Sequence, residues 1–373
     1  MTKIPYLDLS RGRRRIEADL AERWRAVLDA NAFVHGAEVR AFEAAFSDYL
    51  DGAGVVGVGN GTDALTVALR ALGAGPGDEV LVPAFSFFAT AEAVLLVGAT
   101  PVFCDVEETT YNLDPAAAEA SWTDRTAGVI GVHLYGRPFD AERIAALAER
   151  RGGWLLEDAA QAQGARHRGR RVGTLGTLAA WSFYPTKNLG AFGDAGAISG
   201  MDPERVERAR RVANHGQTER YHHVAIGTNS RLDSLQAAVL NLKLAHLDAD
   251  NARRRELAAL YRERLEGVGD LRFPVDRDAD ECVYHQLTIA TERRDELQRY
   301  LAERGIGSSV HYPSPLHRQP ALAASLPAPP DLPRAERAAR EVLCLPMFPE
   351  LEEGEVEGVA AAITDFYAGS RAS

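Results

Sequence analysis

The sequence has little cysteine, no long apolar run and no surplus of basic residues. Its three cysteines, Cys104, Cys282 and Cys344, lie far apart without any C-x-x-C spacing, which excludes a disulfide scaffold and the usual zinc motifs. No apolar stretch approaches the roughly 20 residues of a membrane helix, and the first residues lack the apolar core of a signal peptide. A net charge of −11 argues against a chain-wide nucleic-acid surface. We therefore expect a soluble cytoplasmic protein with no nucleic-acid, membrane or metal partner.

Lysine is also scarce, since the 42 basic residues include only Lys3, Lys187 and Lys243. Where either cation would serve, this chain uses arginine. A lysine that is kept can therefore indicate a place that needs an amine able to lose its proton, which arginine cannot provide. The alternative is that a coding bias toward arginine left three lysines by chance. The residues around each lysine must therefore show whether it has a function.

Short apolar segments alternate with helical patterns over roughly the first half of the chain. The segments expected as strands are 55–58, 79–82, 100–104, 127–132, 154–157, 178–183 and 196–199. Such alternation is typical of an α/β fold, in which helices cover both faces of a large, mostly parallel sheet.

The pattern then changes, and a chain of 373 residues has room for roughly two domains. A long arginine-rich helical pattern, expected strands at 284–290 and 308–312, and terminal helices predict a smaller α+β domain. We place the domains at 1–247 and 248–373. A proline-rich stretch at 325–333 is expected to be a surface connection.

A glycine-rich turn from Gly57 to Ala64 follows the first expected strand and opens a helix. Glycines let a ligand approach the backbone, and a helix N-terminus presents free N–H groups to an anion. The turn therefore favours a phosphate site, with Thr62 as a further donor. A dinucleotide fold would need an acid at the end of the second strand, where Pro83 stands, and no Walker lysine follows. The alternative is an ordinary turn with Thr62 as the helix cap.

Two acids, Glu157 and Asp158, end an expected buried strand, at the edge where α/β sheets bind ligands. A carboxylate at this position can pair with a cationic ring nitrogen. Metal ligation is a poorer explanation, because no histidine or second carboxylate is spaced for it. The alternative is a purely structural role, in which Asp158 caps the N-terminus of the following helix.

Lys187 stands in a turn after another expected strand, between Pro185 and the glycine-rich segment 190–196. An enclosed lysine loses solvation, so its pKa falls. Its amine can then attack a carbonyl and hold an aldehyde as a Schiff base. A solvated surface lysine fits poorly with the apolar neighbours of this residue.

Together these segments supply what pyridoxal 5′-phosphate requires. The glycine-rich turn would hold the phosphate, Asp158 would keep the ring nitrogen protonated, and Lys187 would carry the aldehyde and then move protons. An aromatic face for the ring is expected from Phe85, Phe87 or Phe88, of which at least one must belong to the core.

In their order along the chain, several segments resemble the DegT/DnrJ/EryC1/StrS sugar aminotransferases, a family of fold-type I pyridoxal phosphate enzymes. The segments are 60–65, 77–83, 98–103, 157–161, 182–190, 229–233 and 311–313. The resemblance covers nearly the whole chain and implies a large cofactor-binding domain with a smaller C-terminal domain. Lys187 and the lack of a cysteine cluster distinguish the chain from relatives that remove oxygen, so transamination is favoured.

The resemblance also implies a role for individual residues. Lys187 corresponds to the Schiff-base lysine, Asp158 to the partner of the pyridine nitrogen, and Gln161 to the group near the phenolic oxygen. The other implied cofactor contacts are Gly61, Thr62 and Ser182 at the phosphate, Phe87 against the ring, and Asn229 at the phosphate of the neighbouring subunit. The residues implied near the sugar nucleotide are Arg220, Arg231, His311 and Tyr312. The role of Asn229 implies a homodimer with shared active sites.

The segment 215–223 is similar to the branch of the family that acts on 3-keto sugars. We therefore expect an aminotransferase that moves an amino group, with L-glutamate favoured as donor, to a nucleotide-linked keto sugar, with 3-keto favoured over 4-keto. The product would be an amino sugar for a glycan or natural product. Transfer to a keto-cyclitol and a non-catalytic regulatory protein of the same fold are the alternatives.

Overall fold

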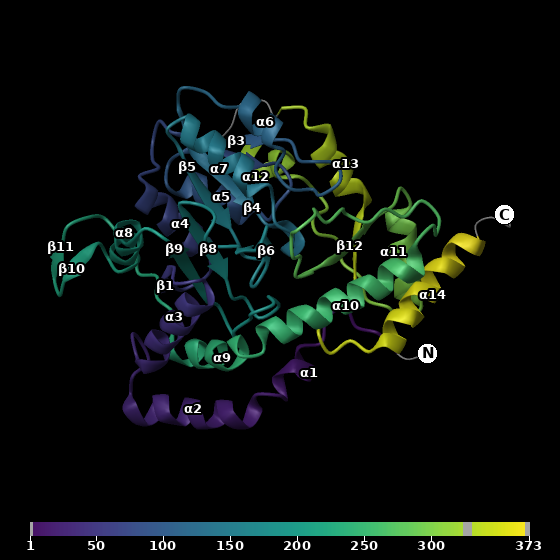
Figure 1. Cartoon of the computed structure of the whole chain (residues 1–373), viewed down its shortest axis with the longest axis horizontal. Helices are drawn as coiled ribbons and strands as arrows, with labels where there is room; N and C mark the ends of the chain where they lie inside the picture. Colours follow the sequence, from purple (N-terminus) through teal and green to yellow (C-terminus); the bar gives the residue numbers. More distant parts are fainter. Residues whose placement is uncertain (1–2, 324–329, 370–373) are drawn as a thin grey trace.

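The computed structural model describes residues 3–323 and 330–369, and a seven-stranded sheet forms its centre (Figure 1). In spatial order the strands are β1 (Gly54–Val58), β9 (Gly196–Gly200), β8 (Leu178–Ser182), β5 (Trp154–Asp158), β4 (Thr126–Val132), β2 (Glu79–Pro83) and β3 (Thr100–Cys104). Only β9 runs antiparallel to its neighbours. The prediction of a mostly parallel sheet is confirmed. Because β1 reverses the direction of β9, the carboxyl ends of the six other strands share one edge.

Helices cover both faces of this sheet, because successive side chains of a strand point to opposite faces. Leu156 packs in one hydrophobic cluster and the adjacent Leu155 in another. The helices on the face of Leu156 are α4 (Gly61–Leu72), α5 (Ala89–Leu96), α8 (Pro203–Ala213) and α13 (Pro333–Glu341). The helices on the opposite face are α3 (Ala37–Tyr49), α6 (Pro115–Ala120), α7 (Ala141–Arg150) and α9 (Ser234–Leu244).

The C-terminal part has its own hydrophobic cluster. The elements that build it are α10 (Leu247–Leu265), β12 (Leu287–Ala290), α11 (Arg294–Glu303), β13 (Val342–Leu345) and α14 (Glu353–Gly369). Ile4 packs in the same cluster and pairs with Ile306, so the start of the chain lies against its C-terminal part. The division at 247/248 stays a prediction.

The structure differs from the expected strands in this region. The strand predicted at 284–290 begins only at Leu287, because Tyr284 adopts the left-handed conformation (φ 42°), which an extended strand does not contain. The strand predicted at 308–312 is reduced to one bridge between Ser309 and Cys344. The partner of β12 is the unpredicted strand β13. The start of the proline-rich stretch, residues 325–329, lies outside the described residues.

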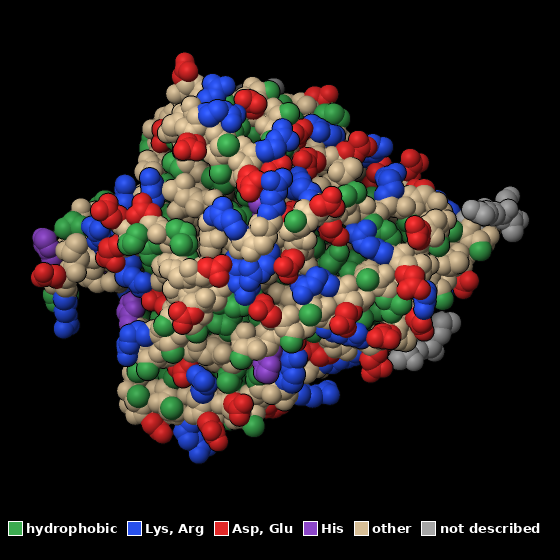
Figure 2. Space-filling view, viewed as in Figure 1, with side chains coloured by type: hydrophobic (Ala, Val, Ile, Leu, Met, Phe, Trp, Pro, Cys, Tyr) green, Lys and Arg blue, Asp and Glu red, His purple; other side chains and the backbone are tan. Residues whose placement is uncertain are grey.

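Smaller elements surround this core. They are α1 (Leu9–Arg13), α2 (Glu17–Ala30), η1 (Leu134–Gly136), β6 (Arg166–His167), β7 (Arg170–Arg171), β10 (Gln217–Glu219), β11 (His222–His223), η2 (Leu316–Arg318) and α12 (Pro320–Ala323). The β10–β11 hairpin projects from the body beyond α8 (Figure 1). Charged side chains of both signs are interspersed over the face shown in Figure 2. No helix within residues 3–323 and 330–369 is long and apolar enough to span a membrane.

Candidate active site

A cavity of about 610 Å³ lies at the edge of the sheet where the parallel strands end. Asp158 is the last residue of β5, Ser182 is the last residue of β8, and Gly61 begins α4 just after β1. The predicted residues that line the cavity are Gly61, Thr62, Phe87, Asp158, Gln161, Ser182, Lys187, His311 and Tyr312. The sheet therefore brings together most of the site predicted from separate segments.

The start of α4 forms a cradle for an anion. Asn60 caps the helix, because its Oδ1 accepts a hydrogen bond from the N–H of Asp63 at 2.8 Å. Thr62 is therefore not the cap, and among the described residues the N–H groups of Gly61 and Thr62 have no hydrogen-bond acceptor. A Cβ at Gly61 would lie 2.6 Å from the Cβ of Ser182. Glycine thus lets the Ser182 hydroxyl approach the free N–H groups of a helix N-terminus, the arrangement that binds phosphate.

Asp158 lies buried at the end of β5, at the same edge of the sheet. Its Oδ2 accepts a hydrogen bond from Thr90 Oγ1 at 3.0 Å, and its Oδ1 accepts one from the N–H of Ala160 at 3.2 Å. Burial raises the pKa of the carboxyl group, while these donors and the nearby Lys187 oppose the rise. No group of three potential metal ligands occurs in the part of the chain that the structure describes.

Lys187 is held in its turn by a hydrogen bond from its own N–H to the carbonyl of Tyr184 at 2.8 Å. Burial lowers the pKa of its amine to about 8, against the opposing effect of Asp158. This agrees with the loss of solvation predicted for an enclosed lysine. Burial lowers the pKa of Lys243 to about 8 as well, but the Nζ of that residue donates to the carbonyl of Gly190 at 2.6 Å. Of the three lysines, only Lys187 lines the cavity.

The remaining wall is aromatic and amide in character. Gln161 accepts a hydrogen bond from the N–H of Tyr135 at 2.6 Å and donates one to the hydroxyl of Tyr312 at 3.0 Å. The ring of Phe87 is 56% exposed and lies 6.0 Å from that of Tyr312, whereas Phe85 is buried in the core. Phe87 is thus the phenylalanine of this loop that can offer a face to a ligand.

Several residues of the cavity and its support were not predicted from the sequence, and four of them carry polar groups near Asp158 or Lys187. Thr90 contacts Asp158, and Tyr6, His285 and Gln286 line the cavity. Thr90 lies just beyond the phenylalanine loop, so its position could have suggested a contact with the same edge. Nothing local marks Tyr6, because it reaches the site through contacts with residues 280 positions away.

Three predicted residues lie elsewhere in the single chain. Arg220 and Arg231 line a separate hollow of about 440 Å³ beside the hairpin. Asn229 is exposed and pairs with Asn214. Their predicted contacts with cofactor and substrate therefore stay predictions that depend on a second subunit.

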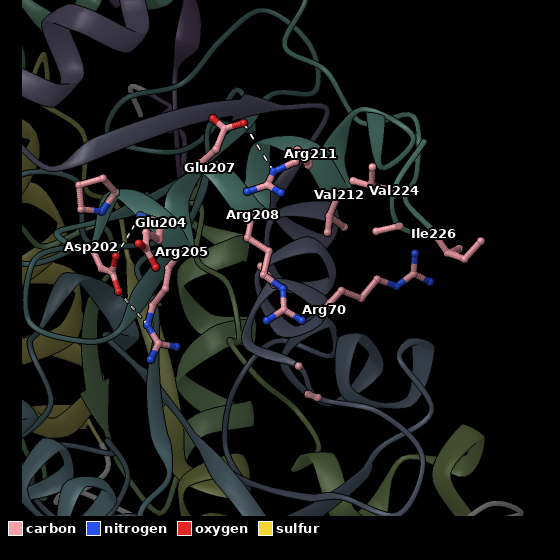
Figure 3. A pocket seen from close by; sticks show the side chains of 15 residues that line it. Arg70, Asp202, Glu204, Arg205, Glu207, Arg208, Arg211, Val212, Val224 and Ile226 are labelled. Carbon is pink, nitrogen blue, oxygen red and sulfur yellow. Dashed lines mark hydrogen bonds and ion pairs between the residues drawn. The ribbon is translucent and has the colours of Figure 1, made fainter. Parts of the chain in front are cut away.

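A larger and more open hollow, of about 1180 Å³, lies between α8, the end of α4 and the residues after the hairpin (Figure 3). Arg205 pairs with Asp202 at 3.2 Å, and Arg211 pairs with Glu207 at 3.7 Å. Its lining includes no lysine, cysteine, serine or histidine. Lys187, Asp158 and Gly61, the residues that the sequence predicts for the chemistry, line the smaller cavity at the strand ends instead.

The residues of that cavity fit pyridoxal 5′-phosphate. The cradle that only a glycine at position 61 leaves open suits its phosphate, and Lys187 lines the same cavity. Asp158 supplies a buried carboxylate for a cationic ring nitrogen. The volume lies within the range of typical cofactor sites.

Comparisons with known proteins agree with this geometry. The DegT/DnrJ/EryC1/StrS aminotransferase family model matches residues 14–364. A dTDP-3-amino-3,4,6-trideoxy-alpha-D-glucose transaminase from Streptomyces venezuelae is 46% identical over 364 residues, which cover 98% of this chain and 96% of the relative. A Geobacillus stearothermophilus protein named pleiotropic regulatory protein is 46% identical over 366 residues, 98% of each chain. The crystal structure of S. venezuelae DesV in complex with a ketimine intermediate matches with a TM-score of 0.96 and 46% identity, over 98% of this chain and 99% of that one.

The fold, the cavity and these matches define an aminotransferase that depends on pyridoxal 5′-phosphate. Its central sheet and its lysine, acid and helix N-terminus at one edge are the parts that such chemistry needs. The chain belongs to the DegT/DnrJ/EryC1/StrS aminotransferase family.

Proposed function

We propose that this aminotransferase transfers the amino group of an amino acid, with L-glutamate favoured, to the 3-keto group of a nucleotide-linked sugar. The observation that carries the proposal is that one cavity is lined by Lys187, by Asp158 and by Gly61 of the anion cradle. The relative from S. venezuelae, whose name describes a 3-amino sugar product, supports the choice of the 3-keto position.

In this proposal each residue has a distinct task. The N–H groups of Gly61 and Thr62 bind the cofactor phosphate, and Ser182 adds a hydroxyl donor. Asp158 keeps the ring nitrogen protonated. Bound in this way, pyridoxal 5′-phosphate supplies an electron-accepting ring that stabilises negative charge on the carbon beside the amino group.

Lys187 is the proposed catalytic base. With a pKa lowered to about 8 by burial, its amine is partly unprotonated near neutral pH and can take a proton from one carbon and return it to another. Gln161 would bind beside the phenolic oxygen of the cofactor, and Phe87 would stack on the ring. His311 and Tyr312, which line the same cavity, would contact the sugar nucleotide.

We further propose that the active form is a homodimer with shared sites. Asn229, Arg220 and Arg231 lie outside the cavity of their own chain, and the projecting hairpin carries a tyrosine, Tyr221, that is 79% exposed. A second subunit would use these residues to complete the phosphate and nucleotide contacts. Guanidinium groups suit a diphosphate because they form paired hydrogen bonds.

The substrate is tested with the pyridoxamine 5′-phosphate form of the enzyme. It is incubated with 3-keto and 4-keto sugars linked to dTDP or UDP and with a keto-cyclitol, and products are identified by mass. We expect amination of a 3-keto nucleotide sugar. Amination of only 4-keto sugars or the cyclitol would contradict the proposed substrate, and no amination at all would favour a regulatory role.

We also propose that the enzyme is located in the cytoplasm. All three cysteines are buried and free, which suits a reducing compartment.

A further inference from the structure

A chain of polar side chains leads from the start of the protein to the residue beside Lys187. The hydroxyl of Tyr6 donates to Oε1 of Gln286. Nε2 of Gln286 lies 3.3 Å from Nε2 of His285, and Nδ1 of His285 lies 3.3 Å from Oδ1 of Asn188. Asn188 directly follows Lys187, so the chain ends in the turn that carries the proposed base.

The direction of these hydrogen bonds is fixed at the Asn188 end. The Nδ2 group of Asn188 donates to Oδ1 of Asn251 and to the carbonyl of Val283, both at 2.9 Å. Both amide hydrogens are therefore used, and Oδ1 of Asn188 can only accept. The Nδ1 atom of His285 must carry the proton that lies between them.

The contact with Gln286 at the other end of the chain agrees with this protonation state of His285. Because Oε1 of Gln286 accepts from Tyr6, the nitrogen of its amide faces His285. An amide N–H group donates and does not accept. With the Gln286 amide oriented as it is in the structure, the Nε2 atom of His285 accepts from it, and the ring is neutral with its proton on Nδ1.

The surroundings of His285 favour the same state. The side chain is 6% exposed, and the cationic or titratable groups that face it are Lys187 on the turn after β8, Arg254 on α10 and His311. Burial and these groups lower the pKa of His285 well below its usual value. None of the groups that shift this pKa is a carboxylate.

We propose that His285 is a positioning residue for the transamination reaction: as a neutral imidazole it holds Asn188, and thereby the turn of Lys187, without placing a second positive charge beside the amine. The inference rests on the proposed role of Lys187. It assigns His285 no contact with the reacting atoms.

Two substitutions separate positioning from simple packing. His285→Leu removes both ring nitrogens, whereas His285→Asn keeps an amide N–H close to the position of Nδ1. We expect His285→Leu to lower kcat at least tenfold with little change in KM, because small displacements of a reacting group reduce rates by up to about 100-fold. His285→Asn should restore most of kcat. Equal losses in both variants would overturn the proposal.

A spectroscopic measurement on the wild-type protein tests the protonation state directly. In protein labelled with ¹⁵N-histidine, with His285→Asn used for assignment, we expect one protonated and one unprotonated ring nitrogen at His285 between about pH 6 and 8. Two protonated nitrogens would overturn the proposal. This result does not depend on the sugar substrate, or on whether the leucine variant folds.

The scarcity of lysine allows a third measurement. Protein labelled with ¹³C at the lysine ε-carbon gives three side-chain signals, which Lys3→Arg and Lys243→Arg assign. In the pyridoxamine 5′-phosphate form, the pKa of Lys187 should differ by less than about half a unit between wild type and His285→Leu. A rise of about one unit or more would mean that a cation had been removed, which contradicts a neutral His285.

Discussion

The Oγ1 atom of Thr90 donates a hydrogen bond to Oδ2 of Asp158 at 3.0 Å, so a residue of α5 supports the acid that ends β5. Thr90 is fully buried, and its hydroxyl lies 2.9 Å from that of Ser86. Its donation lowers the pKa of Asp158 against the effect of burial. The threonine thus helps to keep this buried carboxylate ionised.

Thr90→Val should test this support, because it keeps the shape of the side chain and removes the donor. We expect kcat to fall about tenfold, and the free energy of unfolding to fall by about 1–3 kcal/mol because a buried acceptor loses its partner. Steady-state kinetics and urea denaturation measure the two effects. Thr364→Val on α14, an exposed position where the hydroxyl donates to the carbonyl of Ala360 at 3.0 Å, is a control for the loss of a threonine hydroxyl away from the cavity. A Thr90→Val enzyme with the wild-type kcat would contradict the role.

Replacement of Asp158 by Asn removes the negative charge that we propose stabilises a protonated ring nitrogen of the cofactor. The rate should fall by orders of magnitude, while some cofactor still binds through the phosphate cradle. Turnover and cofactor content are measured on the same preparation. A near-normal rate would mean that another acid protonates the ring.

Lys187→Ala should give a folded protein without turnover and without the visible absorbance of lysine-bound cofactor. Lys3→Arg and Lys243→Arg are controls that keep the positive charge, and both should retain absorbance and turnover. Absorption spectra and circular dichroism record the outcome. An active Lys187→Ala enzyme would refute the proposed base.

The shared site is tested by mixing two variants expected to be inactive, Lys187→Ala and Asn229→Asp, of which the second would place a negative charge beside the phosphate in the proposed shared site. In a mixed dimer with shared sites, one site carries both lesions and the other carries neither. Subunit exchange should therefore restore part of the activity. If activity stays absent although tagged pull-down shows exchange, both residues serve the site of one chain.

The lowered pKa of Lys187 also predicts how stability depends on pH. The amine titrates at about 8 in the folded cofactor-free protein and at its ordinary value of 10.5 in the unfolded chain. Between these values the unfolded chain binds more protons, so this group makes stability rise with pH, and its full penalty remains below about pH 8.

Lys187→Met should therefore stabilise the cofactor-free protein at about pH 7, and the gain should shrink above about pH 10. Urea midpoints at the two pH values measure it. Lys243→Met should gain less, because it loses the hydrogen bond to the carbonyl of Gly190. An unchanged free energy of unfolding for Lys187→Met at neutral pH would show that burial of the Lys187 amine does not destabilise the folded protein.

The part of the site that could be predicted depends on one property of parallel sheets. Asp158, Ser182 and Gly61 come from separate segments, but each lies where an apolar strand ends. Because the carboxyl ends of parallel strands share an edge, their convergence follows once the strands are recognised. The cavity confirms that these residues meet.

Contacts that depend on tertiary packing could not be predicted in this way. The interaction of Thr90 with Asp158 joins residues 68 positions apart, and that of Tyr6 with Gln286 joins residues 280 positions apart. Strand β13 also escaped prediction, since Val342–Leu345 directly continues the pattern of α13 without a turn residue between them. Whether Arg220, Arg231 and Asn229 reach a site depends on a second subunit.

The position of the first few residues has a consequence for trimming of the amino terminus. Ile4 packs in the C-terminal cluster, while Tyr6 and Leu7 form part of the cavity wall. Proteolytic removal of residues 3–7 would therefore remove the part of the cavity wall formed by Tyr6 and Leu7. It would also remove the bridge between Ile4 and Ile306. A truncated protein would lose activity as an active-site variant does, even though every residue expected to touch the cofactor remained in the chain.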